Sequence, residues 1–210
     1  MKTKSHLRLK NVLNKLSKMD YIKPEDVPNI DLYMDQVLTF LDQKLGSVQE
    51  TTEEKPMTKT MINNYTKNQL LPPPEKKKYS RDHVMNLIFI YYMKSFMSMH
   101  DIKSILDPIN EIAFGEDTAL NFSDIYEKVV LQEGKASKDL MRDVMKKYNN
   151  SRSFFPDSPE SNKEDLQDFA FLCSLSFDVF VKKLMIENFI RDRIDKTEDS
   201  EEKNNSSSLT

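Results

Sequence analysis

Apolar residues recur along most of the chain at the three- and four-residue spacing of amphipathic helices. The first such segment lies close to the N-terminus. A second is expected to begin at a cap on Asp31 and to run to about Leu45, where Gly46 ends it. The apolar positions that carry these two helices are Leu7, Leu9, Val12, Leu13, Leu16 and Met19, then Met34, Val37, Leu38 and Leu41.

The middle of the chain predicts three more helices. Thr58 is a good N-cap for a short helix that ends near Leu70, and Ser80 is a good N-cap for the next. This helix from Ser80 is apolar on nearly every side, which is typical of a central buried helix. Ser98 and Asp101 have the spacing of a capping box for a helix that is expected to end before Pro108.

The C-terminal half is also expected to be helical, over about 121–132, about 137–149 and about 163–194. A turn-rich connection covers 151–162, and the polar tail at 195–210 is expected to lack regular structure. No alternating strand pattern of useful length is present, and the only β candidate is a short ribbon around 74–79. The pattern therefore predicts an all-α fold.

Composition narrows the class of protein further. The single Cys173 cannot form an intramolecular disulfide, which suits a reducing compartment. No apolar run reaches the length of roughly 18–20 residues that a membrane span needs. The basic N-terminus is not followed by the apolar stretch of a signal peptide. We therefore expect a cytoplasmic protein without a membrane partner.

No pattern of catalytic or cofactor-binding residues stands out. The 3 glycines are isolated, so no glycine-rich loop can surround a phosphate. His6, His83 and His100 have no metal-ligand spacing, and Cys173 lies in the apolar stretch "FAFLCSLSF", where a structural thiol is expected. We therefore expect a protein that is not an enzyme, with no catalytic residue, no cofactor and no metal site.

Charge is distributed unevenly, although the formal net charge of the whole chain is only −3. Residues 1–24 carry seven basic and one acidic side chain, and residues 57–83 carry six basic and two acidic ones. The tail at 195–210 has five acids and two lysines. This asymmetry fits a surface that faces nucleic acid, but ordinary solvated helix faces would give the same count.

The stretch "TKTMINNYTKNQLLPPPEKKKYS" at 58–80 concentrates the candidate chemistry. Its prolines cannot continue a helix, so the chain leaves in an extended form and the lysines that follow stand clear of the core. Met61, Ile62 and Tyr65 anchor the short helix, which turns an Asn/Thr/Lys face outward. Such side chains read base edges and bind phosphates. The predicted DNA-binding residues are Lys59, Thr60, Asn63, Asn64, Lys67, Lys76, Lys77, Lys78 and Tyr79. The alternative is a small surface helix with a solvated face.

The same stretch, continued to "HDIKSIL", resembles the DNA-binding half of the MerR regulators. The resemblance implies a winged helix-turn-helix in which Thr58 caps the recognition helix, Leu70 to Pro73 form its exit, and Tyr79 closes the wing. Thr60 and Asn63 stand where that family has arginines, and residues 47–56 lengthen the turn between the two helices.

The segments "DLYMDQVLTF", "TKTMINNYTKNQLLPPPEKKKYS" and "LSFDVFVKKLMIEN" are similar to those of a bacterial family described as domain of unknown function 1836. We therefore expect a MerR-like (winged) helix-turn-helix with additional C-terminal helices. The expected regions are a basic helix at 1–24, the helix-turn-helix at 25–110, an accessory or dimerisation region at 111–194, and the acidic tail at 195–210.

The expected function is that of a DNA-binding transcriptional regulator with double-stranded DNA as partner. The recognition helix would be residues 58–70 and the wing residues 74–79. The alternative is a helical adaptor without enzymatic activity, whose basic face binds an acidic protein. The apolar excess at 166–190 suggests a homodimer, although burial within the chain's own core would explain it equally well.

Overall fold

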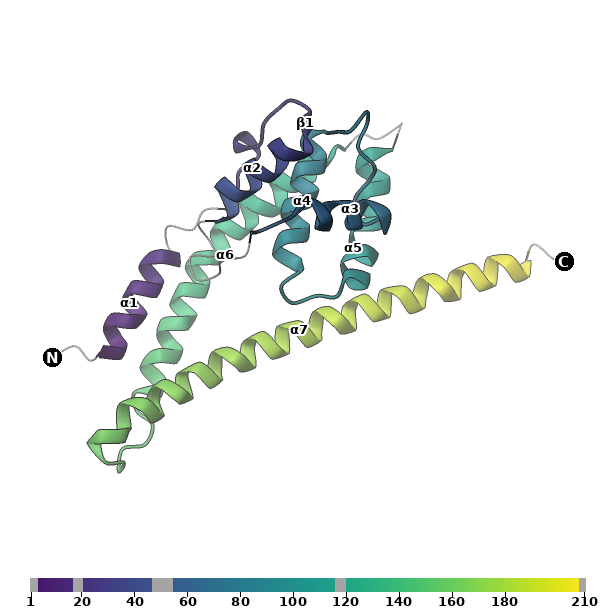
Figure 1. Ribbon diagram of the computed structural model, residues 1–210. Helices are drawn as coiled ribbons and strands as arrows, with labels where there is room; N and C mark the ends of the chain where they lie inside the picture. Colours follow the sequence, from purple (N-terminus) through teal and green to yellow (C-terminus); the bar gives the residue numbers. More distant parts are fainter. Residues whose placement is uncertain (1–3, 17–20, 47–54, 116–119, 208–210) are drawn as a thin grey trace. The chain divides into compact units, whose positions relative to one another are not determined.

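Helices make up most of the described chain, which confirms the all-α class expected from the apolar spacing. The computed structural model describes residues 4–16, 21–46, 55–115 and 120–207, with the backbone alone at 133–137 and 195–207. Figure 1 labels the α-helices and strand β1. The elements are α1 (Lys4–Leu16), η1 (Pro24–Asp26), β1 (Leu32–Tyr33), α2 (Met34–Leu45), α3 (Lys59–Lys67), β2 (Lys78–Tyr79), α4 (Arg81–Met93), α5 (Met99–Phe114), α6 (Phe122–Ser151) and α7 (Glu160–Ser207).

Contacts divide the chain into two units. The first unit combines residues 1–21 with 128–182, and the second combines residues 22–127 with 183–210. The second unit contains η1, both strands and helices α2 to α5. The region boundaries expected from the sequence, after residues 24, 110 and 194, were drawn from sequence motifs. They are not the boundaries of these contact-based units, and they stay predictions.

Helix α4 is the centre of the second unit, as its apolar sequence predicts. Ser80 caps it, because the Ser80 hydroxyl accepts a hydrogen bond from the His83 amide at 3.4 Å. All residues from His83 to Ile88 are buried, and five of them are apolar or amide side chains with no exposed surface at all. Burying Val84, Leu87 and Ile88 stabilises the fold by about 1.5–3 kcal/mol each.

One buried polar contact ties α4 to its neighbours. The Asn86 amide lies in the core with no exposed surface and donates a 2.6 Å hydrogen bond to Asn110 Oδ1 on α5. Asn110 in turn donates to the Leu70 carbonyl, just after α3, at 3.4 Å. Since a buried amide without partners costs free energy, these two linked hydrogen bonds favour one arrangement of α3, α4 and α5 over others.

Helix α2 begins later than the sequence suggests. Its N-cap is Tyr33 and not Asp31, because Leu32 and Tyr33 extend as β1 and pair with β2. The pairing is antiparallel, with Leu32 opposite Tyr79 and Tyr33 opposite Lys78. A strand of two residues is too short to show the alternating pattern of a β-strand. The sequence therefore predicts only the ribbon around 74–79, which contains β2, and does not predict β1.

Helix α5 does not end before Pro108 but continues to Phe114, so the expected stop there is wrong. A proline inside a helix removes one backbone hydrogen bond and usually bends the helix. Contacts on both sides of the proline offset this cost, since Leu106 and Ala113 are buried. The capping box at Ser98 and Asp101 is confirmed, with the Asp101 amide 3.1 Å from the Ser98 hydroxyl.

The C-terminal half has fewer and longer helices than expected. Helix α6 runs without interruption from Phe122 to Ser151, through Gly134, where the sequence suggests two helices. Helix α7 continues to Ser207, past the end near residue 194 and into the tail that was expected to lack regular structure. A glycine inside a helix costs only about 1 kcal/mol, which the turns on either side can offset.

The first unit has a small core where α1, α6 and α7 meet. Leu9, Tyr148 and Phe171 are buried together, and Val144 and Leu175 pack against them. Of the apolar residues expected to be buried on α1, Leu7, Val12 and Leu16 are exposed, and Met19 lies outside the described residues. Only Leu9 and Leu13 on α1 take part in this core.

We predict a pH dependence of stability that arises at His83. The side chain is buried, and burial lowers its pKa below the ordinary value of 6.5, although the backbone carbonyls of Pro72 and Pro73 oppose the shift. The unfolded chain therefore binds a proton first as the pH falls. The free energy of unfolding should be at its plateau above pH 6.5 and should drop below it, by at most about 1.4 kcal/mol per pH unit.

The matched variant for this test is His83→Gln, since glutamine at this place keeps the capping box with Ser80 and cannot titrate. Urea unfolding of both proteins between pH 7.5 and pH 5.5 gives the comparison, and effects of the carboxylates cancel between them. The variant should show the flatter curve. If the free energy of unfolding changed with pH by the same amount in the two proteins, His83 would be ruled out as the origin of the pH dependence.

Candidate nucleic-acid interface

Helix α3 is short, and both of its ends are fixed by local hydrogen bonds. At the N-terminus the Thr58 hydroxyl accepts from the Met61 amide at 3.2 Å, as the sequence predicts. At the C-terminus Gln69 adopts a φ of 59°. The amides of Leu70 and Gln69 then donate to the carbonyls of Tyr65 and Thr66 at 2.8 and 3.1 Å. This is the Schellman arrangement, which closes a helix before an extended segment.

The inward face of α3 anchors it to the second unit. Ile62 has no exposed surface, Tyr65 is 6% exposed and Met61 is half-buried. The outward face holds five predicted site residues, and all of them are exposed: Lys59, Thr60, Asn63, Asn64 and Lys67. No acidic residue lies on the helix. The surface of α3 is therefore a continuous set of hydrogen-bond donors and acceptors with positive charge at both ends.

A tight turn at 75–78 supplies the second group of lysines. The Lys78 amide donates to the Glu75 carbonyl at 2.8 Å, and Lys76 and Lys77 both have positive φ, at 48° and 66°. Two residues with positive φ in a two-residue hairpin loop are the mark of a type I′ turn, where Asn-Gly is the favoured pair. Lysine carries a steric cost in this region of roughly 1–2 kcal/mol per residue.

The three lysines of this turn have different surroundings. Lys76 and Lys77 are exposed, and Lys76 makes only a surface ion pair with Glu75 at 3.6 Å. The Lys78 ammonium lies 5.4 Å from the centre of the Tyr33 ring on β1 and is half-buried. Its partner Tyr33 is 54% exposed, so the pair of side chains forms one side of the ribbon.

Tyr79 occupies a different place from the other predicted site residues. It is 4% exposed and packs edge-on against His83, with ring centres 5.9 Å apart. Burial also raises the pKa of its hydroxyl. Tyr79 therefore anchors the ribbon to α4 and does not belong to the exposed contact surface, which corrects its inclusion among the DNA-binding residues.

A groove of about 470 Å³ runs beside α3 and brings in residues that the sequence did not suggest. Asn64 and Asn68 line it from the α3 side, and Met99, His100 and Lys103 line it from the first turns of α5. The groove joins segments more than thirty residues apart, so no local pattern reveals it. The expected lengthening of the turn between α2 and α3 falls at 47–56, of which 47–54 lie outside the described residues.

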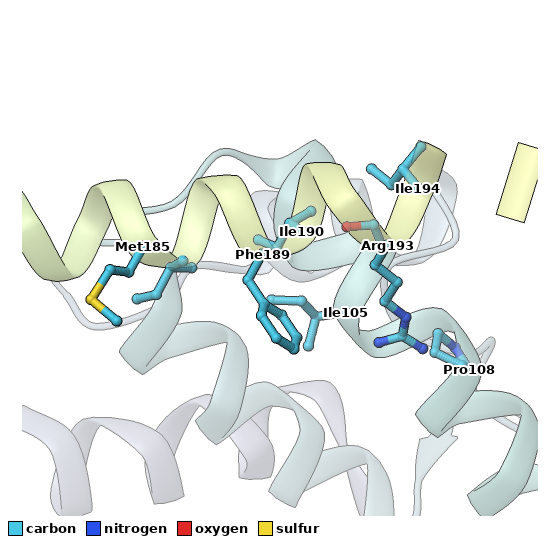
Figure 2. Close-up of a pocket in the computed structure, with 9 residues that line it drawn as sticks. Ile105, Pro108, Met185, Phe189, Ile190, Arg193 and Ile194 are labelled. Carbon is cyan, nitrogen blue, oxygen red and sulfur yellow. The ribbon is translucent and has the colours of Figure 1, made fainter. Parts of the chain in front are cut away.

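A second pocket of the same unit lies between α5 and the part of α7 beyond residue 183, with a volume of about 760 Å³. Figure 2 shows Met185, Phe189 and Ile190 of α7 along its wall, with Ile105 and Pro108 of α5. Among the described side chains that line it, Ser104 and Arg193 are polar.

Among the residues that the structure describes, no group of three or more histidine, cysteine or carboxylate side chains is placed to hold a metal ion. Cys173 is a free thiol, half-buried on α7. Within the same described segments, no helix is both long and apolar enough to cross a membrane.

The comparisons with known proteins agree in part with one of the resemblances drawn from the sequence, since its third segment, at 175–188, lies outside the range that they match. Residues 22–129, slightly more than half of the chain, match the family described as domain of unknown function DUF1836. This range contains all of the second unit's first segment, residues 22–127. Searches of the curated proteins and of the solved structures gave no match. The matched range contains α3, the turn at 75–78 and both strands, and the chain therefore belongs to the DUF1836 family.

Proposed function

We propose that this protein is a DNA-binding transcriptional regulator with a MerR-like winged helix-turn-helix. In the proposal α2 and α3 form the helix-turn-helix, α3 is the recognition helix, and the turn at 75–78 is a short wing. The order of elements supports this assignment, since a strand precedes α2 and pairs with the strand that follows the turn. Both strands lie in the range 22–129 that matches the family.

One observation carries the proposal. Lys76 and Lys77 stand exposed at the two turn positions where lysine is sterically unfavourable and asparagine and glycine would be favoured. Strained backbone is retained mainly where the residues have a role that offsets its cost. Two ammonium groups held away from the core, in the same unit as the acid-free outward face of α3, suit the phosphates of a nucleic acid backbone.

The outward face of α3 suits base contacts in the same proposal. Asn63 and Asn64 are exposed in its middle, where asparagine amides can pair with the edge of adenine, and Lys59 and Lys67 at its ends can bind phosphates or guanine. A helix of nine residues is about 13 Å long and fits across the major groove. Lys78 is expected to contribute less than its neighbours because it already lies against Tyr33.

The first test replaces the wing lysines by the pair that the turn favours, Lys76→Asn with Lys77→Gly. The double variant should be more stable to urea by about 1–3 kcal/mol, because the strain at two positive-φ positions is relieved and only part of this gain is offset by the backbone entropy that glycine loses on folding. Its affinity for duplex DNA should fall equally on all sequences. The slope of log affinity against log salt should flatten by roughly one to two units, at about 0.9 per lost phosphate contact.

Lys128→Gln with Lys138→Gln is the matched control, since it removes the same charge from exposed positions on α6. This control should leave the salt slope unchanged. If the wild type shows no salt-dependent duplex binding at about 50 mM salt, where phosphate contacts are strong, the regulator proposal fails and a helical adaptor takes its place. If the control flattens the slope as much as the wing variant does, only the wing assignment fails.

The second test concerns base reading by α3. Asn63→Ala should weaken binding to a preferred duplex, selected from a random pool, by about 1–3 kcal/mol, and should change binding to random DNA very little. Asn150→Ala, at an exposed position near the end of α6, is the control. Fluorescence anisotropy on both duplexes gives the comparison. Equal losses on selected and random DNA would show that Asn63 contacts the backbone and reads no base.

A further inference from the structure

Helix α7 has two different faces between residues 160 and 187. One face packs in the first unit, where Phe171 and Leu175 join the core with Leu9 and Tyr148. Polar residues on the same face bond to the neighbouring helices. Glu164 accepts from the Ser5 amide at 2.8 Å, and Asp178 pairs with Lys147 at 2.6 Å. This face is therefore already satisfied within the chain.

The opposite face of α7 is apolar; its large side chains are exposed, and Ala170 and Cys173 on it are half-buried. Its residues are separated alternately by four and three positions, which is the heptad spacing of a coiled-coil seam. Phe177 and Phe180 are 67% and 62% exposed, and Phe169 beside them is 64% exposed. We call this set the α7 stripe, and it consists of Leu166, Ala170, Cys173, Phe177, Phe180 and Leu184.

The α7 stripe is complementary to itself when a second copy runs in the opposite direction. With a two-fold axis at the level of Leu175, Leu166 meets Leu184 of the second copy, Ala170 meets Phe180, and Cys173 meets Phe177. Each layer then joins an a position to a d position, as antiparallel seams do, and both phenylalanines face small side chains. Large side chains opposite small ones fill a seam without voids.

Charge at the ends of the stripe favours the same orientation. The next layer of the antiparallel seam places Lys163 opposite Glu187 of the second copy. Within one chain Lys163 pairs with Glu160 at 3.2 Å and donates to the Pro156 carbonyl at 3.4 Å, and Glu187 pairs with Lys183 at 3.7 Å. A parallel seam would place Lys163 opposite Lys163, Glu187 opposite Glu187, and each phenylalanine opposite itself.

The exposed apolar area is sufficient for a stable dimer. On the α7 stripe and its neighbours Phe169 and Val181, three phenylalanines are 62–67% exposed and three aliphatic side chains are 36–50% exposed per copy. With roughly 150–250 Å² for each aromatic side chain, two copies together reach the roughly 1,000 Å² that a specific interface needs. The seam from Leu166 to Leu184 spans about 27 Å of helix. We infer that the partner of the α7 stripe is a second copy of this chain, in an antiparallel seam centred at Leu175. This inference does not depend on the proposed DNA binding.

Analytical ultracentrifugation at tens of micromolar should find the wild type as a dimer. Phe177→Lys with Phe180→Lys should weaken the dimer more than hundredfold, because two central apolar anchors are lost from each copy. Circular dichroism should be unchanged, since both side chains are exposed within one chain. Phe154→Lys, at a 49% exposed position outside the stripe, is the control and should leave the dimer intact. A monomeric wild type, or a dimer that survives the double change, would overturn the inference.

The antiparallel orientation of the two α7 helices is tested separately, in protein that carries Cys173→Ser and so has no other thiol. Diamide oxidation of a mixture of Leu166→Cys and Leu184→Cys proteins should give disulfide-linked heterodimers, and neither protein alone should cross-link. Lys163→Glu or Glu187→Lys alone should weaken the dimer, and the two together should restore it. Cross-linking of each single-cysteine protein with itself would establish a parallel seam and overturn the antiparallel one.

Discussion

The pairing of β1 with β2 is the constraint on which the exposed surface of the second unit depends. Leu32 and Tyr79 face each other across it, and both are buried, at 5% and 4% exposure. A ribbon of two-residue strands has too few hydrogen bonds to persist alone in water. Burial of Tyr79 against His83 therefore holds the ribbon, and the ribbon holds the turn at 75–78. Because α2 and α3 lie between the paired residues 32 and 79, the same contact closes the segment that contains them.

Helix α3 is likewise stabilised by contacts with its surroundings and not by the helix propensity of its own residues. A helix of nine residues is marginal in isolation. The cap at Thr58, the Schellman closure at Gln69 and the buried Ile62 fix both of its ends and its inward face. The contact from Asn110 to the Leu70 carbonyl extends this support to α5. The outward face can therefore carry side chains that contribute nothing to folding. Such freedom is what a binding surface requires.

Features with a local cause could be predicted from the sequence. The caps at Thr58, Ser80 and Ser98 and the buried sides of α3 and α4 depend on residues within one or two turns, so spacing alone indicates them. The continuation of α5 through Pro108 could not be predicted, because packing of Leu106 and Ala113 outweighs the local signal of the proline. The continuation of α6 through Gly134 could not be predicted either, because one glycine is a weak signal whose cost of about 1 kcal/mol does not decide whether a helix stops. Most of the candidate surface follows from the period of α3. The place of Tyr79 in the core and the groove shared with His100 depend on contacts between distant segments.

The central claim is that α3 and the turn at 75–78 form one surface that contacts DNA. Nuclear magnetic resonance of the amide-labelled protein, titrated with a mixed-sequence duplex at about 50 mM salt, tests it most directly, because phosphate contacts are strong at that ionic strength. The account predicts that amide signals of residues 59–67 and 75–78 shift together and with one affinity, and that those of the buried residues 84–88 stay nearly unchanged. Shifts confined to other helices, or no shift at a saturating amount of duplex, would contradict it.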